Sequence, residues 1–155
     1  WCNKNSNYIF AYRIAEWSYG LINNFPVFEE IFTSTSVYYE TLQKISFLNI
    51  KKTGGLGNSD GLEIGTHFSQ NKDFIIQQIE IIKPDVIILC LSFNEFIRKE
   101  LFRDAIWKES GFKIKIGSWR NSKLIDFYHP SSRNAPSAVY SLLQNVCKSS
   151  VFLNL

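Results

Sequence analysis

The segment from Asp85 to Ser92 places the strongest constraint on the fold. It follows Pro84 and reads Asp-Val-Ile-Ile-Leu-Cys-Leu-Ser, a nearly continuous run of β-branched and aliphatic residues. Such a run, in which polar and apolar residues do not alternate, is typical of a strand that is buried on both faces. We therefore predict a central strand here, in a sheet that helices cover on both sides.

Helices and strands alternate along the rest of the chain. Apolar residues at helical spacing predict helices over residues 7–23, 36–44, 69–82, 94–108 and 136–148. Short apolar runs predict further strands over residues 45–50, 113–116 and 124–127. This order indicates an α/β fold, a three-layer sandwich around a central, mostly parallel four-stranded sheet.

The sequence is that of one predicted domain, residues 1–155, because 155 residues suit a single core and no linker or repeat interrupts them. A hydrophobic share of 45% with 20% charged residues is typical of a globular protein. The apolar runs are too short to span a bilayer and no signal peptide opens the sequence, so we expect a cytoplasmic protein without a membrane partner. The net charge of +3 is compatible with a polyanionic partner without requiring one.

Several kinds of site are disfavoured. The cysteines, Cys2, Cys90 and Cys147, are odd in number and widely spaced, which suggests neither a disulfide framework nor a metal site. The two histidines lie far apart and form no helical ligand pair. The sequence contains neither a phosphate-binding P-loop motif nor the Gly-x-Ser-x-Gly element of serine hydrolases. We therefore expect no metal and no cofactor.

Three segments directly follow predicted strands: Asn49 with its loop, residues 92–95, and residues 128–134. Ligands of open α/β sheets bind beyond the carboxyl ends of the strands. We therefore expect these segments to meet at one rim of the sheet and to form the functional site.

The segment that begins with His129 carries the most chemistry. Pro130 restricts the backbone after the histidine, and Ser131 and Ser132 offer hydroxyl and backbone N–H groups that can hold a phosphate. Arg133 adds a charged donor. A lone histidine in a loop is more often structural or merely exposed, but these neighbours favour a functional role for His129, which we predict.

The Asn49 region is open to two interpretations. The amide of Asn49 can present a donor and an acceptor to the edge of a flat ring, although composition alone favours a cap of the strand or the following turn. Lys51 and Lys52 can attract an anionic partner, or they form a solvated pair. His67 belongs to no motif and is assigned no role.

The residues around His129 and Asn49 resemble the uracil-DNA glycosylase superfamily, with the closest likeness to its single-strand-selective branch. His129-Pro130-Ser131-Ser132-Arg133-Asn134 is similar to the His-Pro-Ser-Pro-Arg-Asn element of that branch, and Phe47-Leu48-Asn49 is similar to its asparagine-bearing strand. The resemblance extends to the order of elements over most of the chain, but specific residues match only in these short pieces. Ser132 stands where the family has proline.

The resemblance implies a DNA-repair hydrolase, in which water cleaves the N-glycosidic bond of uracil or a related base that has been flipped out of DNA. Asn49 would bind the base and His129 would stabilise the negative charge that develops on it. DNA contacts would come from residues near these two, namely Lys51, Lys52, Ser131, Ser132, Arg133 and Asn134.

The family's first motif has no match between Trp1 and Phe47. In the family this glycine-containing loop supplies the Asp or Asn that positions the attacking water. We expect it either to lie upstream of Trp1, in a domain that lacks N-terminal residues here, or to be absent. The alternative hypothesis is therefore a noncatalytic nucleic-acid or nucleotide-binding module with a glycosylase-like fold.

Overall fold

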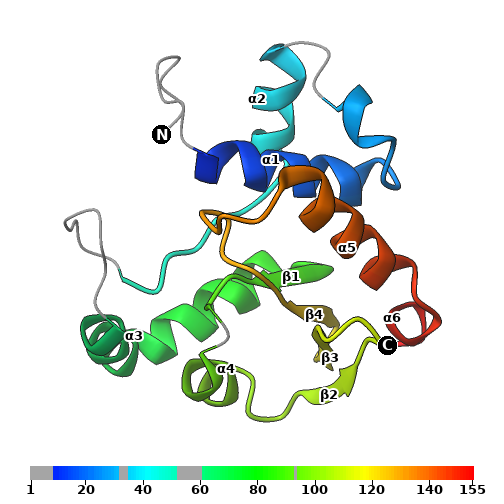
Figure 1. Cartoon of the computed structure of the whole chain (residues 1–155). Helices are drawn as coiled ribbons and strands as arrows, with labels where there is room; N and C mark the ends of the chain where they lie inside the picture. The colour runs from blue at the N-terminus through cyan, green and yellow to red at the C-terminus, as the bar shows by residue number, and fades with distance from the viewer. Residues whose placement is uncertain (1–8, 32–34, 52–60, 93) are drawn as a thin grey trace.

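The computed structural model describes residues 9–31, 35–51, 61–92 and 94–155 (Figure 1). The helices are α1 (Ile9–Ile22), α2 (Thr35–Gln43), α3 (Gly61–Ile82), α4 (Glu95–Leu101), α5 (Pro136–Lys148) and α6 (Ser150–Leu153), with a short 3-10 helix η1 (Phe28–Glu30). The strands are β1 (Val86–Leu89), β2 (Ile106–Glu109), β3 (Lys115–Trp119) and β4 (Ser122–Asp126). The described residues thus form a mixed α/β fold with six α-helices and one open four-stranded sheet.

The sheet is mixed, which corrects the prediction of a mostly parallel sheet. Its order is β1-β4-β3-β2, and of these pairs only β1 and β4 run parallel. The reason lies in the connections. Arg120 and Asn121 alone join β3 to β4, and a two-residue turn permits only antiparallel neighbours. A short turn with Gly111 at φ 88° likewise joins β2 to β3.

Two predicted elements are wrong. Residues 45–50 form no strand, although Leu48 and Ile50 pack against the core. The helix predicted over 94–108 is α4, which ends at Leu101, and β2 occupies its last part. Trp107 pairs with Gly117 of β3, where an added Cβ would lie 3.1 Å from the indole ring, so the ring covers a strand position that has no side chain of its own.

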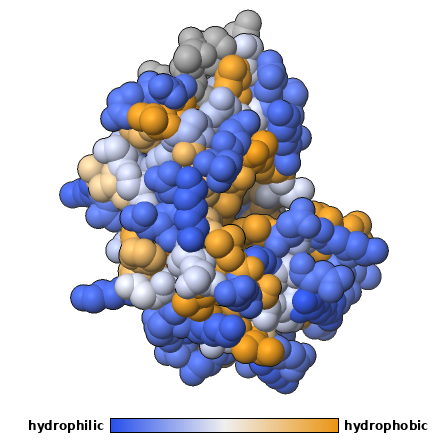
Figure 2. Space-filling view, turned by 90° about the vertical axis from the view of Figure 1, so that its right-hand side faces the viewer, coloured by the Kyte–Doolittle hydropathy of each residue, from blue (hydrophilic) through white to orange (hydrophobic). Residues whose placement is uncertain are grey.

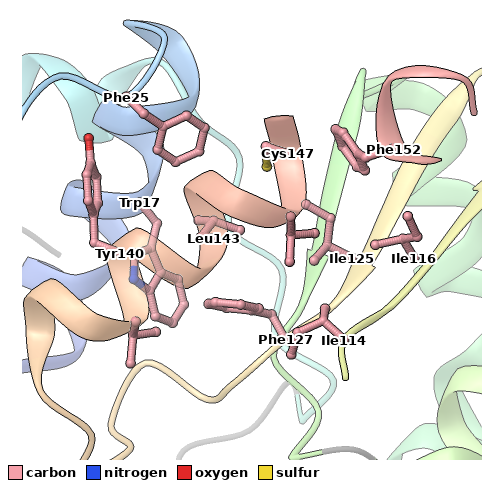
Figure 3. Packing of buried hydrophobic residues seen from close by; sticks show 12 residues of the cluster. Trp17, Phe25, Ile114, Ile116, Ile125, Phe127, Tyr140, Leu143, Cys147 and Phe152 are labelled. Atoms are coloured by element: carbon pink, nitrogen blue, oxygen red, sulfur yellow. The ribbon is translucent and has the colours of Figure 1, made fainter. Parts of the chain in front are cut away.

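One core cluster lies between the sheet and the helices α1, α5 and α6 (Figure 3). Ile125 of β4 and Phe127, which directly follows β4, are two residues apart and project from the same face of the sheet. Both are fully buried. The indole of Trp17 on α1 packs edge to face against Phe127, with ring centroids 5.2 Å apart. Helix α1 is thereby fixed against the segment that leaves β4, as the apolar spacing in 7–23 predicts.

A second cluster covers the opposite face of the sheet, where α3 and α4 pack. Leu89 of β1 and Leu124 of β4 point to this side, against Phe68 and Ile75 of α3. Because neighbouring residues of β1 join different clusters, this strand packs on both faces as its composition predicts, although only Leu89 is fully buried. It is not central, however: among the described residues β1 lies at one end of the sheet and pairs with β4 alone.

Apolar side chains also reach the surface, where Figure 2 shows them in patches among hydrophilic residues on one face of the molecule. Leu62, Phe74 and Ile81 of the long helix α3 are 80%, 65% and 74% exposed. The same helix carries many polar residues. Among the described residues, no helix combines the length and the apolar character that crossing a membrane requires.

Candidate functional site

The parallel pair β1 and β4 creates the rim on which the candidate site lies. Leu89 pairs with Asp126 at the carboxyl ends of the two strands, and the Phe127 N–H donates to the Leu89 carbonyl at 2.9 Å. The two chains that leave this edge border an open depression of about 320 Å³. Its lining is formed by Ser92, Tyr128, His129, Ser131 and Ser132. Two of the three segments expected at one rim therefore meet there.

Backbone hydrogen bonds fix the orientation of the His129 ring. The N–H of Ser131 donates to His129 Nδ1 at 3.2 Å, and the N–H of Ser132 donates to the His129 carbonyl at 2.9 Å. Pro130, which is buried, holds the turn between them. Because Nδ1 accepts a hydrogen bond, the proton of a neutral imidazole must sit on Nε2, so the ring presents Nε2–H as a donor.

The surroundings of His129 favour this neutral form. The ring of Phe10 on α1 lies beside the imidazole, with centroids 5.7 Å apart. Partial burial lowers the pKa of His129 from its usual value of 6.5. Protonation would also place a proton on Nδ1 against the Ser131 N–H and break their bond. The imidazole is therefore an uncharged donor at neutral pH.

We expect nuclear magnetic resonance to report a His129 pKa below 6.5 in the folded protein. The folded state then binds fewer protons than the unfolded state. The contribution of His129 to the free energy of unfolding is therefore highest above pH 6.5 and falls as the pH drops through the folded-state pKa. The measurement is a pH titration of the imidazole resonances, assigned with His129→Gln. A titration midpoint at or above 6.5 would contradict the burial argument.

Ser92 supplies the wall of the depression opposite the histidine segment. It lies just past β1 with φ at 51°, a left-handed conformation that is uncommon for a residue with a side chain. The turn is held by the Asn94 N–H, which donates to the Leu91 carbonyl at 3.0 Å, and the Asn94 side chain caps α4 by accepting from Ile97. A strained residue at a rim is a common property of functional sites.

Asn49 is exposed in the irregular segment before Lys51 and is not among the lining residues of the depression. Its neighbour Phe47 nevertheless contacts Phe10 edge to face, with centroids 5.4 Å apart. Phe10 therefore touches both Phe47 and His129, which brings the Asn49 segment to the same side of the molecule as the depression.

The predicted DNA-binding residues fall into four groups, one of which, Ser131 with Ser132, lines the depression. Lys51 forms an ion pair at the surface, because its Nζ lies 2.6 Å from a carboxylate oxygen of Glu63 in the first turn of α3. Lys52 lies outside the described residues. Arg133 and Asn134 are exposed beyond the serines, with the Asn134 amide 3.5 Å from the Ser132 hydroxyl.

Sequence reasoning missed the contribution of α1. Phe10 contacts His129, and Arg13 donates from Nη2 to the Asn134 carbonyl at 2.7 Å. One signal was present: Arg13 is a charged residue within the apolar stripe of its helix, between Phe10 and Trp17. A charge in a core-facing position has to find a partner, and here the partner belongs to the candidate site.

The surroundings of Cys90 disfavour thiol chemistry at this edge of the sheet. Cys90 follows β1, but burial and the nearby charge of Asp126 raise the pKa of its thiol to about 12. The thiol is therefore protonated at neutral pH and is a poor nucleophile. In the described part of the chain, His, Cys, Asp and Glu side chains form no group of three that is suited to a metal ion.

The candidate site is thus a neutral, oriented histidine in an open depression that two serines, a tyrosine and a strained turn also border. No family model, curated protein or solved structure matches this chain.

Proposed function

We propose that this protein is a DNA glycosylase-like hydrolase that cleaves the N-glycosidic bond of uracil or a related damaged base in DNA. The observation that carries the proposal is the hydrogen bond from the Ser131 N–H to His129 Nδ1, which leaves Nε2–H as a fixed, uncharged donor at the rim. The resemblance of residues 129–134 to the uracil-DNA glycosylase motif supports the same assignment.

In the proposed reaction, His129 Nε2–H stabilises the negative charge that develops on the departing base. As the bond between the sugar and the base breaks, electrons pass to the base and negative charge builds on its carbonyl oxygens. His129 Nε2–H would donate to such an oxygen, and a donor that is already oriented needs no rearrangement at that moment. Water supplies the oxygen that joins the sugar carbon, and the base leaves with the proton.

The base and the DNA strand would occupy neighbouring surfaces. Asn49 would hydrogen-bond the edge of the base from the segment that Phe10 links to His129. Ser131, Ser132, Arg133 and Asn134 would contact the backbone of the strand. In this proposal the sheet with helices on both faces is a uracil-DNA-glycosylase-like three-layer sandwich, and the parallel pair β1 and β4 is the part of the sheet that forms the site.

One observation favours the alternative, a noncatalytic nucleic-acid or nucleotide-binding module. The described residues that line the depression include no Asp or Glu, so none of them is a carboxylate that could activate water. A module of this kind would hold a phosphate chain through Arg133 and the serines, and its affinity would fall steeply as the salt concentration rises.

Base release from uracil-containing oligonucleotides is the decisive experiment. We expect free uracil and an abasic site to form with single-stranded or double-stranded substrate, and no release from the matching oligonucleotide that carries thymine or cytosine. Binding of the same oligonucleotides is measured over a range of salt concentrations. Salt-dependent binding without base release would overturn the enzymatic proposal and support the binding module.

A further inference from the structure

One side of helix α1 follows the chain that leaves β4. Phe10, Arg13 and Trp17 are three and four residues apart, so their side chains project from the same face of the helix. Trp17 packs on Phe127, Phe10 on His129, and Arg13 reaches the carbonyl of Asn134. The helix therefore contacts the 127–134 segment before, at and after the histidine.

Burying the charged side chain of Arg13 at this position costs free energy. It is only 6% exposed, and its Nε lies 3.8 Å from the Glu16 carboxylate, a distance too long for a strong hydrogen bond. Its Nη1 is buried and finds no hydrogen-bond partner among the described residues, and neither does Glu16 Oε2. A buried charge with partial pairing contributes little to stability compared with an apolar residue of similar size. Within the described part of the chain, the one short hydrogen bond of the guanidinium is the bond to the Asn134 carbonyl at 2.7 Å.

The far end of the 129–134 segment depends on that bond. The two backbone hydrogen bonds that shape the segment, from Ser131 and Ser132, both end on His129. After Asn134, helix α5 begins at Pro136, which has no N–H, and its N-cap residue Ala135 offers no side-chain hydrogen bond. The guanidinium of Arg13 thus holds a part of the chain that its local sequence leaves weakly fixed.

We infer that Arg13 is a positioning residue of the candidate site. It anchors the end of the 129–134 segment at Asn134, while Phe10 supports the beginning at His129. Together they hold the turn in which the Ser131 N–H meets His129 Nδ1, and so they keep the imidazole in the orientation that leaves Nε2–H free to donate. Arg13 touches no substrate in this role. Its effect on base release rests on the proposed function, but its effect on the turn does not.

The test measures the turn directly, by amide hydrogen exchange of Ser131 and Ser132 in the full chain. Arg13→Met keeps much of the side-chain volume and removes the donor. We expect exchange of these two amides to accelerate by about 10- to 100-fold, as the loss of a charge-assisted hydrogen bond predicts, while the amides of β3 and β4 exchange as in the wild type. Arg103→Met is the control, because this arginine is exposed and its ion pair among the described residues is the one with Glu100 at 3.0 Å.

Two further measurements complete the design. Arg13→Gln is the second variant, since it keeps a polar group beside Glu16 and yet is too short to replace the guanidinium, and it should show the same loss of protection if the methionine variant does not fold. Where uracil is released, kcat should fall by about 10- to 100-fold with little change in KM, because a displaced donor affects the reacting state more than binding.

If the amides of Ser131 and Ser132 exchange at wild-type rates in either folded Arg13 variant, Arg13 is not a positioning residue. If the wild-type protein releases no base, the proposed function fails, and the exchange rates still decide the role of Arg13. Faster exchange in the variants would then assign the same positioning role in a site that only binds.

Discussion

Replacing His129 with alanine is expected to lower kcat for uracil release by about 100- to 1,000-fold, the usual cost of removing one oriented donor from developing negative charge. The fold should be preserved, because the side chain is only partly covered and contributes mainly the contact with Phe10. Single-turnover release from a uracil-containing oligonucleotide measures the loss, and thermal unfolding measures the fold. The affinity for the oligonucleotide should change little, since the donor acts chiefly in the transition state.

His67→Ala is the matched control, because this histidine lies on α3 outside the lining of the depression, and it should retain wild-type release. His129→Gln offers an amide N–H in place of the imidazole N–H and should restore part of the lost rate. If His129→Ala releases uracil at the wild-type rate, the imidazole takes no part in the reaction and the oriented Nε2–H is a structural feature only.

The position of the site was predictable because it depends on one parallel pair of strands. Residues 85–92 and 124–127 carry strong strand signals, and both lead directly into the polar residues that line the depression. The carboxyl ends of parallel neighbours lie at the same edge, so the meeting of Ser92 with His129 follows from the sequence pattern. The roles of the lining residues stay predictions until they are tested.

The rest of the sheet was harder to predict because its pairing depends on contacts between distant residues. Residues 94–108 carry apolar side chains at spacings that suit a helix, but their last part pairs with β3, where Trp107 covers Gly117. Residues 45–50 have the composition of a strand, but they form none, because a strand also needs a neighbouring strand with which to form hydrogen bonds. In both segments tertiary packing decides the outcome.

The contacts between α1 and the candidate site could not be predicted from the sequence for a different reason. Helical spacing predicts the apolar face of α1, but it does not reveal that this face meets the 127–134 segment more than a hundred residues later. Arg13 stands out only as a charge in an apolar stripe. The sequence therefore indicated a residue that requires a partner, and only the fold identifies the partner as the Asn134 carbonyl.

Replacing Asp126 with alanine is expected to reduce the free energy of unfolding by about 3–5 kcal/mol, measured by chemical denaturation. The Asp126 carboxylate and Arg98 of α4 form a buried hydrogen-bonded ion pair, with side-chain exposures of 2% and 7%. The variant leaves the Arg98 guanidinium buried over the ring of Trp107 without its buried anion, and the carboxylate of Glu95, 3.5 Å away, is 58% exposed and replaces it poorly. Such a loss is a large part of the stability of a small domain, which is about 5–15 kcal/mol.

The ion pair between Asp126 and Arg98 is not itself a large source of stability. The loss expected for Asp126→Ala comes mainly from leaving the buried charge of Arg98 unpaired. Burial raises the pKa of Asp126, and the hydrogen bond and charge of Arg98 offset only part of that effect. The double variant Arg98→Met with Asp126→Leu should therefore recover most of the stability that Asp126→Ala loses. Glu80→Ala is the control, because it breaks an exposed pair with Arg120 and should cost less than about 1 kcal/mol. A double variant as unstable as the single one would mean that the pair stabilises the junction of β4 and α4 by direct attraction.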